Sequence, residues 1–185
     1  DFPRVVTAVT AEATTRIDDL VLLDAGEQRR QLDEWNATQA AAPRDQTLHA
    51  LFAAQVRRTP GRIAVTLGDE QISYAELDAR ANRLAHRLRA QGVGPDTLVA
   101  VCLDRSIDLV AALLGVLKAG GAYLPLDPAY PRERLAFTVQ DAQVQYLLTT
   151  AALAAAITEP VAHVTRLDAD AAALAAEPAT APDES

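Results

Sequence analysis

The chain is poor in several residue types, and each shortage excludes a class of function. It has a single cysteine, Cys102, and no methionine, so neither a disulfide nor a thiolate metal site can be built from its own side chains. Cys102 lies in the apolar run 98–103, where a cysteine behaves as a small hydrophobe. No apolar stretch approaches the roughly 20 residues that cross a bilayer, and the N-terminus lacks the basic and apolar regions of a signal peptide. We therefore expect a cytoplasmic protein with no membrane partner.

Basic residues are also few, and Lys118 is the only lysine. The formal net charge is −8, which argues against a nucleic-acid partner, because lysine and arginine contacts to phosphates supply most of that affinity. Aromatic residues make up only 4% of a chain that is 50% hydrophobic, so alanine and leucine must form the core of these 185 residues. The sequence begins at Asp1 rather than at a methionine, and we expect it to be a piece of a longer protein.

The most informative stretch is residues 117–131, LKAGGAYLPLDPAYP. Lys118 suits the negative end of a helix dipole, and Gly120 with Gly121 is predicted to supply the positive φ that ends the helix. Residues 122–126 form an apolar run of strand length. Asp127 precedes a proline and must be extended. The stretch predicts a helix end, a glycine turn, a short buried strand and a bend.

A second informative stretch, residues 72–91, predicts a long helix. Ser73 is followed three residues later by Glu76, which is the capping-box pattern of a helix start. The apolar residues that follow are spaced four, three, one and three positions apart, as on one helical face: Leu77, Ala81, Leu84, Ala85 and Leu88. Arginines occupy the other faces, and Gly92 is predicted to end the helix.

Both stretches resemble core motifs of the adenylation domains of nonribosomal peptide synthetases, in the family's order. The first is similar to the pattern LKAGxAYLPLDPxYP, and the second to TYxEL followed by ANRLAHRLR. Residues 22–38, with LLD and EWNAT, resemble the segment that joins a condensation domain to an adenylation domain. The resemblance extends over about residues 1–168 and implies a leader followed by the front part of the larger N-terminal subdomain.

This resemblance and the composition divide the chain into three parts. We expect a condensation-to-adenylation linker at 1–38, the front of the adenylation subdomain at 39–168, and a disordered tail at 169–185, which has few large apolar side chains. Asp24 is predicted to cap a helix in the linker. Trp35, the only tryptophan, is interpreted as an anchor that docks the linker onto a neighbour, with an exposed contact point as the alternative.

The order of elements predicts an α/β fold. Two short strands, 63–66 and 71–73, form a β-hairpin around Gly68. After the long helix come alternating strands and helices: strands 98–103, 122–126, 144–148 and 161–167, and helices 106–119, 131–141 and 151–157. This alternation favours right-handed βαβ units and a mainly parallel sheet with flanking helices. The resemblance implies a partial N-terminal subdomain of the adenylate-forming (ANL) fold, which should leave apolar surface or a strand edge uncovered.

The resemblance also implies a reaction. Members of the family activate an amino acid with ATP and magnesium to an aminoacyl adenylate, and pass it to a phosphopantetheine thiol on a carrier domain. Their phosphate loop has the form YTSGSTGxPKG, and backbone amides of such a glycine-rich turn hold polyphosphates. Here no glycine follows Gly121, and Lys118 at a helix C-terminus cannot replace the loop, because that end repels anions. We therefore predict no catalytic, cofactor-binding or metal-binding residue in this chain, and an inactive fragment.

The sequence offers other candidate sites, but a structural role explains their residues better than a functional one. Gly115 and the glycines after it lie within and behind a helix, whereas a dinucleotide site needs them between strand and helix. The three histidines, His49, His86 and His163, are not at metal-ligand spacing. Asp104, Asp108 and Asp127 suggest a carboxylate site, but Asp108 favours a helix start and Asp127 an Asp-Pro turn.

Two alternatives to an adenylation-domain fragment stay open. One is a non-catalytic docking or linker module, and the other is an acyl-CoA synthetase or aryl-acid ligase of the same superfamily. The EWN-containing leader and the LPLDPxYP form favour peptide synthetases. The partners implied are the neighbouring condensation domain, the remainder of the adenylation domain and a carrier domain, while ATP, magnesium and phosphopantetheine belong to the complete synthetase.

Overall fold

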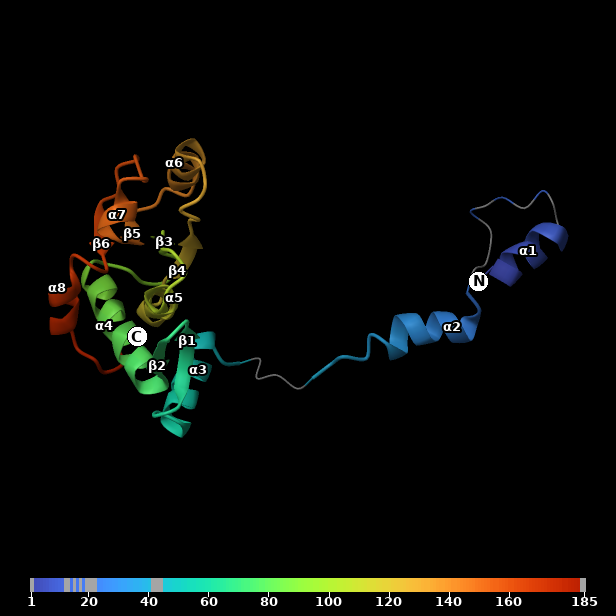
Figure 1. Cartoon of the computed structure of the whole chain (residues 1–185), viewed down its shortest axis with the longest axis horizontal. Helices are drawn as coiled ribbons and strands as arrows, with labels where there is room; N and C mark the ends of the chain where they lie inside the picture. Colours follow the sequence, from blue (N-terminus) through green and yellow to red (C-terminus); the bar gives the residue numbers. More distant parts are fainter. Residues whose placement is uncertain are drawn as a thin grey trace. The chain divides into compact units, whose positions relative to one another are not determined.

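A computed structural model describes residues 2–11, 14, 16, 18, 23–40 and 45–183. The chain divides into two compact units, residues 1–45 and 46–185 (Figure 1). The first unit contains α1 (Phe2–Ala11), α2 (Ala25–Arg29) and the π-helical turn η2 (Arg30–Glu34). No described helix is long and apolar enough to cross a membrane.

In the first unit, the predicted cap at Asp24 is confirmed. The Asp24 Oδ1 atom accepts from the backbone N–H of Glu27 at 2.7 Å, and the Asp24 N–H donates to Glu27 Oε2 at 3.2 Å. No residue of α2 or η2 is buried. Local hydrogen bonds rather than packing therefore form this helix.

The second unit is an α/β structure with a hairpin, as predicted. Its helices are α3 (Leu48–Arg58), α4 (Tyr74–Ala90), α5 (Ile107–Ala119), α6 (Arg132–Asp141), α7 (Ala151–Ala154) and α8 (Ala171–Ala176). Its strands are β1 (Ile63–Leu67), β2 (Glu70–Ser73), β3 (Leu98–Val101), β4 (Ala122–Pro125), β5 (Tyr146–Thr149) and β6 (His163–Arg166). Strands β1 and β2 pair antiparallel, and the other four form a parallel sheet in the order β4-β3-β5-β6.

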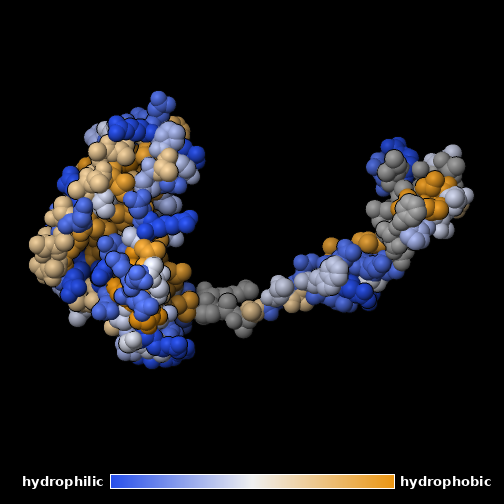
Figure 2. All heavy atoms as spheres, in the orientation of Figure 1, coloured by the Kyte–Doolittle hydropathy of each residue, from blue (hydrophilic) through white to orange (hydrophobic). Residues whose placement is uncertain are grey.

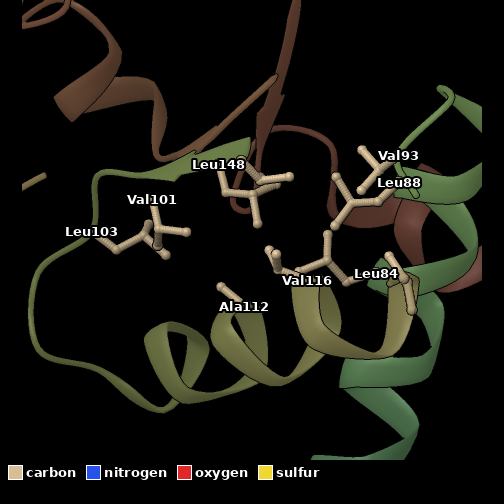
Figure 3. Packing of buried hydrophobic residues seen from close by; sticks show 11 residues of the cluster. Leu84, Leu88, Val93, Val101, Leu103, Ala112, Val116 and Leu148 are labelled. Atoms are coloured by element: carbon tan, nitrogen blue, oxygen red, sulfur yellow. The ribbon is translucent and has the colours of Figure 1, made fainter. Parts of the chain in front are cut away.

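Side chains of β3 alternate between two cores on opposite faces of the parallel sheet. Val99 and Val101 pack with residues of α4 and α5, and Leu148 of β5 joins them (Figure 3). Ala100 and Cys102 point the other way, into a cluster with residues of α6 and the segment after α7. A strand buried on both faces needs apolar residues at every position, and β3 has them.

Helices α4 and α5 pack closely because α5 has a glycine at the contact. A Cβ added at Gly115 would lie 3.0 Å from Leu84 Cβ. The predicted apolar face of α4 is buried in the structure, and a third cluster joins α4 and α5 to the hairpin and α3. The predicted cap at Ser73 also forms, since its hydroxyl accepts from the Glu76 N–H at the start of α4. Ser106, the first residue of the predicted helix 106–119, precedes α5 in the structure and caps it by accepting from the Leu109 N–H.

The prediction for the glycine pair after α5 is only half right. Gly120 has φ 91° and ends the helix in the left-handed region, as predicted. Gly121 does not have a positive φ. It is required for space instead, since a Cβ there would lie 2.8 Å from Val93 Cγ1 and 3.0 Å from the Thr97 carbonyl oxygen.

The C-terminal segment differs from the disordered tail that its composition predicts. Helix α8 lies beside α4 (Figure 1), and Leu174 packs against the first core. Beyond α8, three polar side chains of α4 hold the backbone carbonyls of the segment: Asn82 Nδ2 to Ala179 at 2.7 Å, His86 Nε2 to Thr180 at 3.0 Å, and Arg89 Nη1 to Asp183. Donors on α4 thus replace the apolar contacts that the tail lacks. Residues 184–185 lie outside the described part.

Large apolar side chains are exposed on β4, on α6 and between them, and among the described strands β4 pairs with β3 alone. Tyr123 on β4 is 43% exposed, Tyr130 is 40% exposed and Phe137 on α6 is 66% exposed. Figure 2 shows apolar residues at several places on the surface of this unit.

Candidate functional site

The carboxyl ends of the parallel strands are the expected place for a site, because ligands of open α/β sheets bind there. The polar groups at these ends are engaged locally. Asp127 Oδ1 accepts from the Ala129 N–H at 2.9 Å, which confirms the predicted Asp-Pro turn. Thr150 caps α7 through Leu153, and the two carboxylate oxygens of Asp168 accept from the Ala151 N–H at 2.9 and 3.1 Å.

The protonation state of the Cys102 thiol, which lies at this edge, does not suit a nucleophile. Burial raises the pKa of the Cys102 thiol, and the carboxylates of Asp104 and Asp127 raise it further. The thiol therefore stays protonated at neutral pH, whereas a nucleophile must be a thiolate. Hydrogen bonds from the backbone N–H groups of Ala151 and then Ala169 lower the pKa of Asp168, which is a carboxylate held in a turn.

The edge also does not fit a nucleotide polyphosphate. The segments directly after β3, β4, β5 and β6 contain no glycine, so these strand ends do not form the nest of backbone amides that cradles phosphates. The residues present here thus do not fit the ATP and magnesium of the implied reaction.

The most concentrated charge chemistry lies elsewhere, between α4 and α5. Lys118 Nζ donates to Asp78 Oδ1 at 2.7 Å and to Asn82 Oδ1 at 2.6 Å. The Asn82 amide then donates to Asp78 Oδ2 at 2.9 Å and to the Ala179 carbonyl at 2.7 Å. We call Lys118, Asp78 and Asn82 the lysine cluster.

The lysine cluster is largely shielded from solvent, and its polar groups are paired with one another. The Lys118 side chain is 6% exposed and that of Asp78 is 19% exposed, and the aromatic ring of Phe52 lies 6.0 Å from Nζ. Because the ammonium is paired with a carboxylate and an amide, it is already satisfied and cannot serve as a free phosphate ligand. The cluster joins α4, α5 and the C-terminal segment.

Sequence reasoning placed Lys118 correctly in the last turn of α5 but missed its partners. The signal was present, because Asp78 and Asn82 are four residues apart and therefore lie on one face of the helix. The basic residues of that helix include four arginines and no lysine. Only the packing of α4 on α5 shows that this face meets Lys118.

The remaining candidate residues do not converge. His86 contacts the C-terminal segment, and the ring of His163 is stacked on Tyr146, with centroids 5.0 Å apart. Asp108 lies in the first turn of α5, as predicted, and pairs with Arg80 at 3.0 Å. Within the described part of the chain, no group of three or more histidine, cysteine or acidic side chains could hold a metal ion.

The fold, the cap at Ser73 and the glycine turn after α5 agree with the family that the two sequence motifs resemble. A family model described as AMP-binding enzyme matches residues 52–185. The chain belongs to this family of AMP-binding enzymes.

The relatives narrow the class to nonribosomal peptide synthetases. The chain is 45% identical over 174 residues to a component of the linear gramicidin synthase of Brevibacillus parabrevis, and the match covers 94% of this chain and 3% of that relative. A crystal structure of the nonribosomal peptide synthetase FmoA3, in its alpha-methyl-L-serine-AMP bound form, is similar with a TM-score of 0.72 and 32% identity over 98% of this chain and 21% of the other. The AMPPNP-bound form has a TM-score of 0.72 and 34% identity over 85% and 17%. The resemblance to the adenylation domains of these synthetases is confirmed over most of the chain.

Proposed function

We propose that this chain is the front part of an adenylation domain that, when complete, activates an amino acid with ATP and magnesium and transfers it to the phosphopantetheine thiol of a carrier domain. The observation that carries the proposal is the alignment of nearly the whole chain, leader included, with a synthetase structure that holds an aminoacyl-AMP-type ligand. The implied partners are the preceding condensation domain, the rest of the adenylation domain and the carrier domain. The cytoplasmic location stays a prediction.

We propose further that the 185-residue chain forms no adenylate by itself. The strand ends without glycine turns support this, and so does Lys118, whose ammonium is paired with Asp78 at 2.7 Å. Calorimetric titration of the chain with ATP and magnesium should give no saturable heat. Binding at low micromolar affinity would contradict the proposal.

The activity of the parent can be tested with an extended protein. Joined to the residues that follow in its reading frame, the chain should support exchange of pyrophosphate into ATP with one or a few α-amino acids. A site that hydrogen-bonds an α-ammonium rejects analogues that lack it. A panel of proteinogenic and nonproteinogenic amino acids, fatty acids and aryl acids provides the measurement.

Each other result of that assay favours a different function. Exchange only with acids that lack the α-amino group would favour the acyl-CoA or aryl-acid ligases. No exchange from a folded, complete domain would favour the docking module.

We propose that residues 1–38 link this domain to the condensation domain, with Trp35 as the anchor. Trp35 is 65% exposed and Leu32 is 61% exposed, so both are available to a neighbour. Adding the condensation domain should shift the Trp35 fluorescence to shorter wavelength. An unchanged spectrum in the joined protein, compared with a Trp35→Phe variant for background, would leave Trp35 as an exposed residue without an anchoring role.

A further inference from the structure

The two described sheets have edge strands, and these strands differ in how they are protected against pairing with another chain. The strand order makes β1, β2, β4 and β6 the edges. Strand β4 contains Pro125, β2 contains Glu70 and β6 contains Arg166. Prolines and charged side chains at an edge hinder the addition of a further strand. Strand β1, Ile63–Leu67, has neither a proline nor a charged residue.

The sequence of β1, IAVTL, is typical of a strand that pairs readily. Ile63, Val65 and Thr66 are β-branched, and such residues favour strands. Ile63 is 50% exposed and Leu67 is 44% exposed. Strand β2 pairs with one edge of β1 (Figure 1), and no described strand pairs with the other. Strand β1 therefore offers an open edge to which an extended segment can add through backbone hydrogen bonds.

The charges that flank β1 favour a second copy of the chain, in antiparallel orientation. Arg62 precedes the strand and Asp69 lies in the turn that follows it, and both residues are exposed. When two β1 strands pair antiparallel about Val65, Ile63 of each copy lies opposite Leu67 of the other. Arg62 of each copy then lies beside the turn that carries Asp69 of the other, so opposite charges meet at both ends. Parallel pairing would instead place like charges side by side, which is unfavourable.

We propose that β1 is a self-association edge, which pairs antiparallel with β1 of a second copy of this chain. The same surface is used by both copies, as in most two-fold dimers, and the two hairpins join into one continuous sheet. Because the contact is centred on a strand of 5 residues, the dimer is weak and reversible. The proposal does not depend on the adenylation reaction, since it uses only the hairpin.

Analytical ultracentrifugation of the 185-residue chain tests the association. The chain should be monomeric at about 1 μM and should shift reversibly to a dimer by about 500 μM, as expected for a small interface. A monomer over the whole range would overturn the proposal and would leave the edge of β1 to a strand from the rest of the adenylation domain.

A lysine on the edge strand should block the contact. Thr66 is exposed on β1, so Thr66→Lys should leave the fold intact. It should weaken the dimer about tenfold, because two like charges then meet across the paired strands. Gln140→Lys adds the same charge at an exposed position of α6 and should leave the association unchanged. Equal dissociation constants for the two variants would place the contact elsewhere and overturn the proposal.

An exchange of charges tests the antiparallel arrangement. Arg62→Glu brings like charges together at both ends of the paired strands, and so does Asp69→Arg, so each variant alone should dimerise about tenfold more weakly. An equimolar mixture of the two variants should regain the affinity of the unsubstituted chain, because their new side chains attract each other. Circular dichroism shows that both variants are folded. A mixture that associates no more strongly than the separate variants would overturn the antiparallel pairing.

Discussion

The two capping boxes of this chain have the same chemistry and different outcomes. Asp24 with Glu27 starts α2, which has 5 residues and passes into a π-helical turn without burying any side chain. Ser73 with Glu76 starts α4, which has 17 residues and six buried ones. The cap fixes where a helix begins, and packing of its apolar face decides how far it extends and how stable it is.

The largest expected difference between the two regions is in apolar side chains. Leu88 on α4 is 1% exposed, whereas Leu32 in η2 is 61% exposed. Leu88→Ala should lower the free energy of unfolding by about 2 to 5 kcal/mol, since it removes buried methyl groups and leaves a cavity. Leu32→Ala should change it by less than about 0.5 kcal/mol. Urea unfolding curves measure both, and equal effects would contradict the division into a packed and an unpacked region.

Ion pairs should show the same contrast with a smaller effect. Asp78→Ala leaves Lys118 buried without its carboxylate and should cost about 2 to 3 kcal/mol, which is less than for a fully buried pair because Asp78 keeps some solvent contact. Glu34→Ala breaks the exposed pair with Arg30, whose atoms lie 4.0 Å apart, and should cost less than about 0.5 kcal/mol. Urea unfolding of both variants provides the comparison, and a cost for Asp78→Ala as small as that for Glu34→Ala would contradict it.

A further variant separates the lysine's charge from its packing. Lys118→Met removes the buried charge together with its need for a partner, and it should cost less than Asp78→Ala. Chemical denaturation of both single variants decides this, and a larger cost for Lys118→Met would mean that the ammonium itself stabilises the fold.

Removal of a helix cap should have the next smaller effect on the free energy of unfolding. Ser73→Ala should lower the free energy of unfolding by about 1 kcal/mol, because the Glu76 N–H loses its acceptor at the start of a packed helix. Asp24→Ala should reduce helical circular dichroism but leave the main melting transition in place. A shifted main transition in Asp24→Ala would show that α2 contributes to the stability of the second unit.

The smallest expected effect is a pH dependence at α4. The hydroxyl of Ser73 and then its backbone N–H donate to Glu76 and lower the pKa of that carboxyl. A pKa that is lower in the folded state means that the stabilisation is present above the ordinary value, about 4.3, and is lost as pH falls through the folded-state pKa. Below that pH, the melting temperature should fall less steeply with decreasing pH in Glu76→Gln than in the unsubstituted chain.

Most elements of the second unit could be predicted because their signals are local. The cap at Ser73, the glycine at 120 and the apolar period of α4 each depend on neighbours within a few residues. The order of the C-terminal segment could not be predicted, because it depends on donors of α4 that lie far away in the sequence. The partners of Lys118 likewise appear only when α4 packs on α5.

The hydrogen bond from Asn82 to Ala179 joins positions 97 residues apart in the sequence. During synthesis the chain leaves the ribosome from its N-terminus, so α4 and α5 emerge long before the carbonyl that completes the hydrogen bonds of the lysine cluster. Contacts between distant positions form late, because the intervening chain must first be ordered. Closure of this segment over α4 should therefore report that strands β3 to β6 have emerged and folded, which makes it a late step in the vectorial folding of the second unit.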